Sequence, residues 1–259
     1  MEILFYFLVC VGATTVGGIS GVGGGVIIKP VMDAVSGLPV STISFLSGCT
    51  VLGMTGTSLL RARGGPVKVE ARRGTALAVG AALGGVAGKE IFELVRALGA
   101  ETVSAAQQVM MILLTLGVLV YTLNRSRIRS LNVEGTAACG AIGLALGVMS
   151  AFLGIGGGPI NLAVLYYFFS MDSKTAALNS LYVILFSQGA SLLTTFARGN
   201  VPDLQWPMLI AMVIGGVLGG NLGRAASKKL DNSGVDRVFF WLLLAITAIS
   251  CYNLYRCFV

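Results

Sequence analysis

The chain has 259 residues, of which 55% are hydrophobic and only 11% are charged, with a formal net charge of +7. Soluble domains carry about 25% charged residues, so this composition excludes an ordinary soluble domain and favours an integral membrane protein built of helices. The basic excess lies in short loops between apolar segments, where membrane proteins place Lys and Arg, and we therefore expect no binding to nucleic acid.

The residue types exclude several kinds of chemistry. There is no histidine, and the cysteines form no CxxC pair, so neither a His-containing metal site nor a Cys-only zinc site is expected. The sequence shows no nucleophile–base pair either, so we expect no enzyme and no cofactor. The first segment, MEILFYFLVC, has no basic n-region, and we expect it to be the first span and not a removed signal.

Apolar segments of about 20 residues or more predict eight membrane spans. They cover residues 3–36, 39–60, 74–98, 103–123, 135–170, 174–196, 204–226 and 234–257. The first and the fifth are too long for one simple span and too short for two. Each contains a glycine run, SGVGGG at 20–25 and LGIGGG at 153–158. We therefore expect a helix, a break at the glycines and a second half-helix in each.

The glycine runs belong to an internal repeat. An offset of 133 residues carries Gly21 onto Gly154, Ser47 onto Ser180 and Ser58 onto Ser191. Further on, GAALGGVAG at 80–88 recurs as GGVLGGNLG at 215–223, at an offset of 135. This ordered series predicts an all-α membrane protein of two homologous four-span halves, residues 1–131 and 132–259.

The number of spans in each half predicts its direction. An even number makes both halves enter the membrane from the same side, as a parallel repeat. If each interrupted segment crosses twice, the halves are inverted instead. With eight spans, the basic loops at 61–73 and 124–130 share a side with both termini, and the positive-inside rule makes that side cytoplasmic. The basic residues at 224–236 oppose this orientation.

We expect the two glycine runs to bind an anion. Glycine costs roughly 1 kcal/mol in a helix, and unwound backbone at membrane depth is tolerated only where it is buried or lines a cavity. In broken transporter helices the freed N–H groups and the positive end of the next half-helix face an anion. Pro159 fits the first turn of such a half-helix.

Two alternatives to an anion site were considered. The dinucleotide pattern GxGxxG fails in both glycine runs, because Val26 and Pro159 stand where the last glycine belongs. The other alternative is close helix packing, which small residues permit in membranes. For GAALGGVAG and GGVLGGNLG we favour packing.

The paired motifs GISGVGGGVIIKPVM and AFLGIGGGPINLAVL resemble the sulfite exporter TauE/SafE family, also called the toluene-sulfonate uptake permease family. The resemblance covers nearly the whole chain. It implies a substrate that is a small sulfur oxyanion or an organic sulfur acid, such as sulfite, thiosulfate, a sulfonate or sulfoacetate. Members differ in substrate and direction, so the resemblance gives a class only.

Polar side chains near the glycine runs complete the predicted site. Lys29 and Asp33 are four residues apart and share a helix face. At membrane depth such groups point to function, although Lys29 would snorkel to the interface if its half-helix ended there. Lys29 would supply charge to the anion, and Asp33 would pair with it or titrate as the coupling residue. The predicted substrate-binding residues are Gly21, Gly23, Gly24, Gly25, Gly154, Gly156, Gly157, Gly158, Ser47, Ser180, Asn179, Gln188, Lys29 and Asn161.

The sequence thus predicts a multi-pass secondary transporter of the cell membrane that moves a small sulfur anion by alternating access. A passive anion channel or a permease for another small organic anion is the alternative. A protein with a structural, partner-binding role is the third interpretation. The sequence leaves open whether the chain forms a homodimer.

Overall fold

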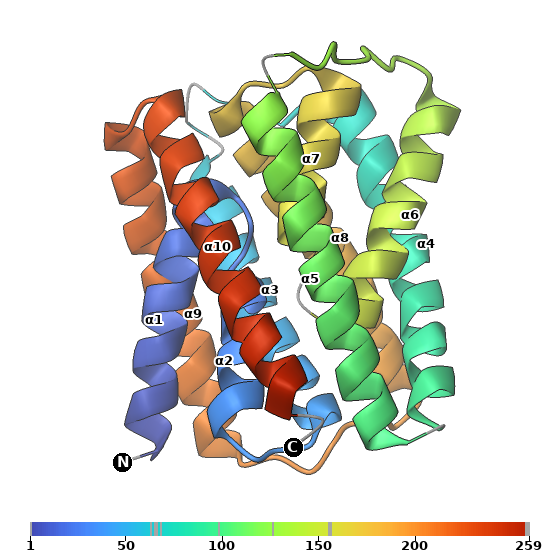
Figure 1. Ribbon diagram of the computed structural model, residues 1–259, viewed down its shortest axis with the longest axis vertical. Helices are drawn as coiled ribbons and strands as arrows, with labels where there is room; N and C mark the ends of the chain where they lie inside the picture. The colour runs from blue at the N-terminus through green and yellow to red at the C-terminus, as the bar shows by residue number, and fades with distance from the viewer. Residues whose placement is uncertain are drawn as a thin grey trace.

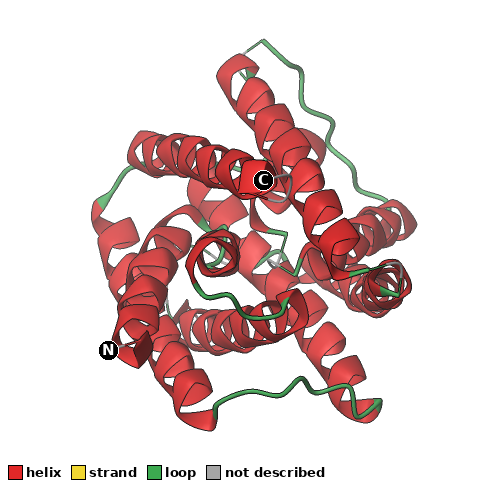
Figure 2. Cartoon of the chain, turned by 60° about the horizontal axis from the view of Figure 1, so that its bottom comes forward, coloured by secondary structure: helices red, strands yellow, loops and turns green. Residues whose placement is uncertain are grey.

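The computed structural model describes residues 2–62, 64, 67, 69–97, 99–125, 127–154 and 157–256. These residues form helices joined by loops, with no strand among them (Figure 2). In chain order the helices are α1 (Glu2–Ser20), α2 (Gly25–Val35), α3 (Val40–Ala62), α4 (Ala71–Arg96), α5 (Ala100–Asn124), α6 (Thr136–Leu153), α7 (Gly158–Phe169), α8 (Ser173–Ala197), α9 (Trp206–Lys229) and α10 (Asn232–Arg256).

Eight of the described helices are long and apolar enough to cross a membrane, which confirms the eight predicted spans. The other two, α2 and α7, have 11 and 12 residues. They follow α1 and α6, so each of the two interrupted segments contains one long and one short helix. The boundary predicted between residues 131 and 132 falls in the connection between α5 and α6.

Both termini lie at one end of the molecule, which we call the lower end (Figure 1). The connections at 36–39 and 198–205 also lie there. The connections at 127–135, 170–172 and 230–231 lie at the opposite end, which we call the upper end (Figure 1).

Each interrupted segment is a helical hairpin. Tyr6 and Cys10 of α1 share a buried cluster with Met32 of α2, so α2 returns toward the end from which α1 starts. In the second hairpin, the N–H groups of Leu131 and Val133 donate to carbonyls near the end of α7, at 2.7 and 2.8 Å. The start of α6 and the end of α7 therefore lie together at the upper end.

The reversals occur at glycines with positive φ. In the first hairpin these are Gly21 and Gly23, with φ of 78° and 77°. In the second they are Gly154 and Gly157, with φ of 65° and 70°. Only glycine enters this region without a steric penalty from a Cβ atom. The glycines therefore turn the chain back on itself instead of only interrupting a helix.

The prediction of a parallel repeat is wrong. Figure 1 shows α1 rising from the lower end and α6 descending from the upper end, so the two segments run in opposite directions. Because each interrupted segment turns back, each half contains an odd number of helices. The prediction that these basic loops share a side with both termini is wrong for the same reason. Their described residues, such as Arg73 with its partner Glu134 and Arg125 beside Met171, lie at the upper end, away from both termini.

Two pairs of parallel helices lock the halves together through small residues. A Cβ atom on Gly84 of α4 would overlap the carbonyl oxygen of Leu144 of α6. A Cβ atom on Gly219 of α9 would overlap the carbonyl oxygen of Val11 of α1. The repeated motifs at 80–88 and 215–223 therefore serve close helix packing, as their spacing predicted. Each hairpin's long helix packs against a helix of the other half.

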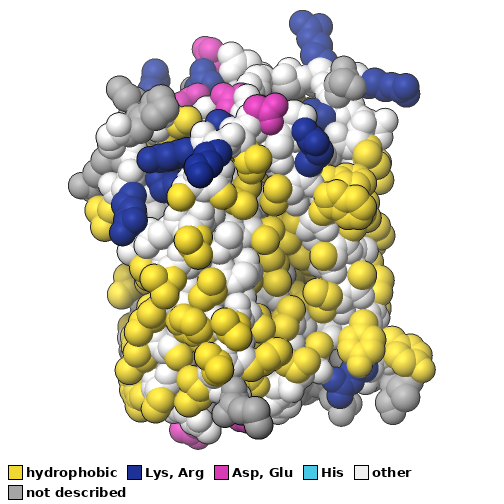
Figure 3. Space-filling model, turned by 90° about the vertical axis from the view of Figure 1, so that its left-hand side faces the viewer, with side chains coloured by type: hydrophobic (Ala, Val, Ile, Leu, Met, Phe, Trp, Pro, Cys, Tyr) yellow, Lys and Arg dark blue, Asp and Glu magenta, His cyan; other side chains and the backbone are white. Residues whose placement is uncertain are grey.

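The surface is apolar along the bundle and basic at one end. Figure 3 shows Lys and Arg gathered at the upper end, above a surface rich in hydrophobic side chains. The described basic residues near the upper end are Arg61, Arg72, Arg73, Arg125, Arg127, Arg129, Lys174, Arg224, Lys228, Lys229 and Arg237, and those near the lower end are Lys89, Arg198 and Arg256.

We predict that Gly84→Ala destabilises the fold. The added methyl group would have to push α6 away from α4, and overpacking of this kind costs about 1–3 kcal/mol. Gly117→Ala in α5 is the matched control, because nothing lies within 4 Å of its Cβ position. Thermal unfolding in detergent should show a lower melting temperature for Gly84→Ala and no loss for Gly117→Ala. Equal melting temperatures would contradict the packing assignment.

Candidate functional site

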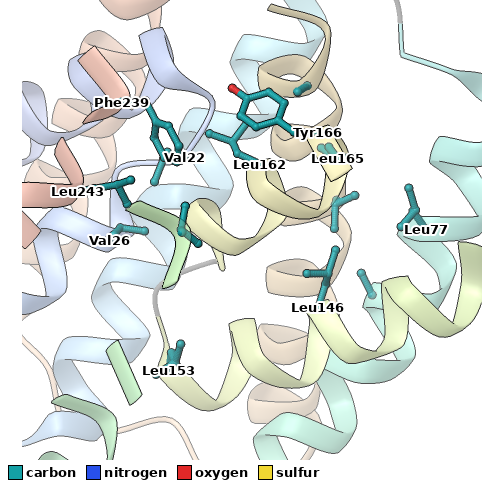
Figure 4. Packing of buried hydrophobic residues seen from close by; sticks show 14 of the residues in the cluster. Val22, Val26, Leu77, Leu146, Leu153, Leu162, Leu165, Tyr166, Phe239 and Leu243 are labelled. Carbon is teal, nitrogen blue, oxygen red and sulfur yellow. The ribbon is translucent and has the colours of Figure 1, made fainter. Parts of the chain in front are cut away.

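The two glycine breaks are in direct contact inside the bundle. The carbonyl oxygen of Val22, in the first break, occupies the space that a Cβ atom on Gly158 would need. Val22 is fully buried in a cluster with Leu162 of α7 and Phe239 of α10 (Figure 4). The backbones of the two hairpin tips therefore meet, and Gly158 permits the close approach.

Each break also contacts a helix of the other half, and the two contacts correspond. Gly21 lies against the backbone of Ala177 in α8, and Gly154 lies against Ser44 in α3. Ala177 follows Ser44 by the same 133 residues that separate Gly154 from Gly21. The offset found in the sequence thus relates contacts in space as well.

Three of the predicted polar residues are buried beside the breaks without a hydrogen-bond partner. Ser47 and Ser180 are 0% exposed, one turn beyond Ser44 and Ala177 on their helices, and neither hydroxyl is paired. Asn161 is also 0% exposed, and neither atom of its amide is paired. A buried polar group without a partner costs about 1–3 kcal/mol, so such groups need an explanation. A polar ligand would supply their missing partners.

Lys29 belongs to a buried network. Its Nζ lies 3.1 Å from Asp33 Oδ2 and donates to Gln107 Oε1 at 2.8 Å. Gln107 in turn donates from Nε2 to the carbonyl oxygen of Phe152, at the end of α6, at 2.6 Å. Gln108 donates to the same Asp33 oxygen at 3.1 Å. The network joins α2, α5 and α6 directly below the second break.

The structure pairs Lys29 with Asp33, which is one of the two roles that the sequence predicted for Asp33. The side chains of Lys29 and Asp33 are 3% and 7% exposed, so the pair is held inside the bundle and Lys29 does not snorkel to the interface. The pair is formally neutral. The Cε of Lys29 also lies near Gly154, and two of the three ammonium donors of Lys29 are used by Asp33 and Gln107.

The remaining predicted residues that the structure describes either make hydrogen bonds within the protein, line a pocket or are buried at a helix start. Asn179 has a structural role, because its Oδ1 accepts from the Glu70 N–H at 3.2 Å and its Nδ2 donates to the Thr175 carbonyl at 2.9 Å. Gln188 lines a pocket at the lower end. Gly24 and Gly25 are buried at the start of α2. Gly156 lies outside the described residues.

Sequence reasoning missed three residues of this region. Gln107 and Gln108 are two adjacent amides inside the apolar segment 103–123, and both are buried. Two adjacent amides in an apolar segment were the feature of the sequence that could have indicated them. Ser44, whose hydroxyl is buried without a partner, has alanine at the matching position of the second half, so the repeat did not point to it.

Two pockets approach the breaks from opposite ends. The lower pocket, of about 30 Å³, is lined by Ser44, Lys89, Gly154 and Gln188 among others. The upper pocket, of about 150 Å³, includes Ala177, which contacts Gly21. Each pocket thus reaches a residue at or against one break, whereas Ser47, Ser180 and Asn161 line neither pocket. Within the described part of the chain, no group of His, Cys, Asp or Glu side chains could hold a metal ion.

The chain is similar to proteins described as probable membrane transporters. The chain is 24% identical to a probable membrane transporter protein, YunE, of Bacillus subtilis (strain 168), over 97% of this chain and 98% of that relative. It is 27% and 29% identical to probable membrane transporter proteins from two strains of Xylella fastidiosa, over 45% of this chain and 43% of each relative. No solved structure matches the chain significantly.

The family model described as sulfite exporter TauE/SafE matches residues 6–250, which is nearly the whole chain. Its extent covers all ten described helices in whole or in part, including both hairpins. This chain therefore belongs to the sulfite exporter TauE/SafE family of membrane transporters.

Proposed function

We propose that this protein is a secondary transporter of small sulfur-containing anions, of the sulfite, thiosulfate, sulfonate or sulfoacetate class. The observation that carries the proposal is the meeting of two glycine breaks beside Ser47, Ser180 and Asn161, whose buried polar groups have no partner. Hydroxyl and amide donors suit an oxyanion, which accepts hydrogen bonds on every side. The N–H groups of Gly21, Gly23 and Gly154 already donate to the Gly17 and Ser150 carbonyls, so the side chains carry the proposal. The sulfur class itself rests on the family name.

The matched contacts support alternating access. We propose that residues 1–131 and 132–259 are inverted repeats, related through the breaks, as in other secondary transporters. An exchange of the two halves' conformations would then open the lower pocket and close the upper one, or the reverse. A passive channel with the same site is the alternative. It would show no trans-stimulation by substrate.

The basic upper end supports a revised orientation in the cell membrane. Lys and Arg concentrate on the cytoplasmic side of membrane proteins, and here they concentrate opposite the termini (Figure 3). We propose that the upper end is cytoplasmic and that both termini lie on the outer side.

We predict that Ser47→Ala, Ser180→Ala and Asn161→Ala weaken substrate binding without loss of folding. These side chains have no protein partner to lose, whereas a hydrogen bond to a charged substrate is worth about tenfold or more in affinity. Uptake of radiolabelled sulfite and thiosulfate into proteoliposomes should show half-saturation raised about tenfold.

Ser250→Ala is the control for these variants, because Ser250 is a buried serine without a partner on α10, which carries no residue of either break. It should keep the half-saturation of the parent protein. Uptake of neither anion by the parent protein would refute the substrate class. Saturable uptake that all three variants leave unchanged would refute the site.

We predict that Lys29→Leu destabilises the protein strongly and that adding Asp33→Leu restores it. The single change leaves a buried carboxylate without its partner, which costs about 3–5 kcal/mol, whereas an apolar pair removes both charges. Melting temperatures in detergent would measure this loss and its recovery.

We also propose that Asp33 couples transport to protons, so the restored double variant should lose accumulation driven by a pH gradient. A double variant that folds and accumulates substrate as the parent does would exclude the pair from coupling.

We predict that a periplasmic phosphatase fused to the C-terminus is active in a bacterial host, and that a green fluorescent protein fused there stays dark. Both results follow from the proposed orientation, because the phosphatase needs export and the fluorescent protein fails to mature after it. The same two reporters placed in the 127–135 connection should give the opposite results. A fluorescent C-terminal fusion would contradict the proposed orientation and place the C-terminus in the cytoplasm.

A further inference from the structure

The upper pocket is a cationic cavity enclosed by α1, α3, α8 and α9. Its volume is about 150 Å³, and three basic residues line it, Lys174, Arg224 and Lys228. Gly18 and Ala177 form the part nearest the first glycine break. The pocket therefore connects the basic end of the molecule with the interior.

The polar groups of this pocket lack partners. The Nε atom of Arg224 is buried and makes no hydrogen bond. Ser58, which also lines the pocket, is 2% exposed, and its hydroxyl has no partner. A buried guanidinium nitrogen and a buried hydroxyl are both expected to be paired in a folded protein. Both can donate to an oxygen atom in the cavity.

No carboxylate neutralises the pocket. Within the described residues, no acidic group lies within ion-pair distance of Lys174, Arg224 or Lys228. The nearby acids of the upper end have other partners. Asp172 accepts from the Lys174 and Thr175 N–H groups at the start of α8, and Asp236 pairs with Arg125. The cavity therefore carries uncompensated positive charge.

The matching pocket at the lower end is different in charge. Lys89 corresponds to Arg224 at the offset of 135, and Ser41 corresponds to Lys174 at the offset of 133. Lys89, however, is paired with Glu93 at 3.1 Å and lies over the Phe92 ring. The lower pocket is also smaller, at about 30 Å³. The repeat thus places the same kind of pocket at both ends but leaves only the upper one with unpaired cations.

We propose that the upper pocket is a binding site for a small oxyanion, with the Arg224 guanidinium and the Ser58 hydroxyl as ligands and Lys174 and Lys228 at its mouth. Sulfate, sulfite, a phosphate or a sulfonate group has the charge and the acceptors that this site takes. The binding itself does not depend on transport. That a transported substrate binds in this pocket before it reaches the glycine breaks rests on the proposed function.

The test places a cysteine in the pocket and measures whether it reacts faster with an anionic or with a cationic thiol reagent. Ser227 lines the cavity beside Lys228. Ser227→Cys is made in a background without Cys251 and Cys257, and the full-length protein is placed in phosphatidylcholine nanodiscs. A sulfonate-bearing methanethiosulfonate and its trimethylammonium analogue are compared by their labelling rates. The ratio of the two rates reports anion attraction at the site.

Three controls match this measurement. Lys229→Gln removes one charge from the same helix end without touching the pocket, whereas Arg224→Gln removes it from the cavity. Ser41→Cys reports on the lower pocket. Nanodiscs containing phosphatidylglycerol, compared with addition of sodium sulfate, distinguish an anionic lipid headgroup from a free oxyanion.

We expect Ser227→Cys to favour the sulfonate reagent more than Ser41→Cys does, and sulfate to slow its labelling in both kinds of nanodisc. Arg224→Gln should lower the preference about tenfold, and Lys229→Gln much less. Equal effects of Arg224→Gln and Lys229→Gln would refute a built site. Slowing by phosphatidylglycerol without any effect of sulfate would refute a soluble ligand. Because no transport is measured, a failure of the proposed function would leave this result intact.

Discussion

The architecture depends on backbone-to-backbone contact at the tips of the two hairpins. The Val22 carbonyl can reach Gly158 only because Gly158 has no side chain, and the chain can turn back there only because neighbouring glycines adopt positive φ. A tip made of ordinary residues would separate the hairpins by at least a side chain. The contacts of Gly21 with α8 and of Gly154 with α3 would then be lost as well.

The sequence predicted the membrane-spanning helices well, but it predicted poorly the direction in which the two halves cross the membrane. Spans are set by long apolar runs, and each run is read from local residues, so all eight long helices were predictable. Direction depends on whether a broken segment continues or reverses. SGVGGG is compatible with both, because the pattern of glycines does not specify which of them takes positive φ. The basic loops were wrongly placed at the same end as the two termini as a direct consequence.

The candidate site was predictable in part for a similar reason. Ser47 and Ser180 were found because the repeat marks them twice, and Asn161 because it follows a glycine run. The pairing of Lys29 with Asp33 was among the predictions, but the contact of Lys29 with Gln107 was not, because Gln107 is 78 residues away along the chain. A helix periodicity shows which residues share a face, but it cannot show which distant helix covers that face.

The polar interior separates into two kinds of group. In the Lys29 network most groups are paired with one another, and these pairs tie α2 and α5 to the end of α6. Only Asp33 Oδ1 and Gln108 Oε1 among its described atoms are buried without a partner. The groups beside the breaks are open, since their donors and acceptors are unused. A satisfied network stabilises one arrangement of helices. Unused groups lower the stability of the empty protein and are recovered when a ligand binds.

The packing of α1 against α9 has a consequence for how the protein is made. The partner of α1 is formed by residues 206–229, which leave the ribosome long after α1 itself. During synthesis the small-residue face of α1 therefore contacts lipid or an insertion factor until most of the remaining helices have been inserted. Contacts between segments so far apart in sequence form late. A chain that ended before α9 would leave this small-residue face of α1 without its partner.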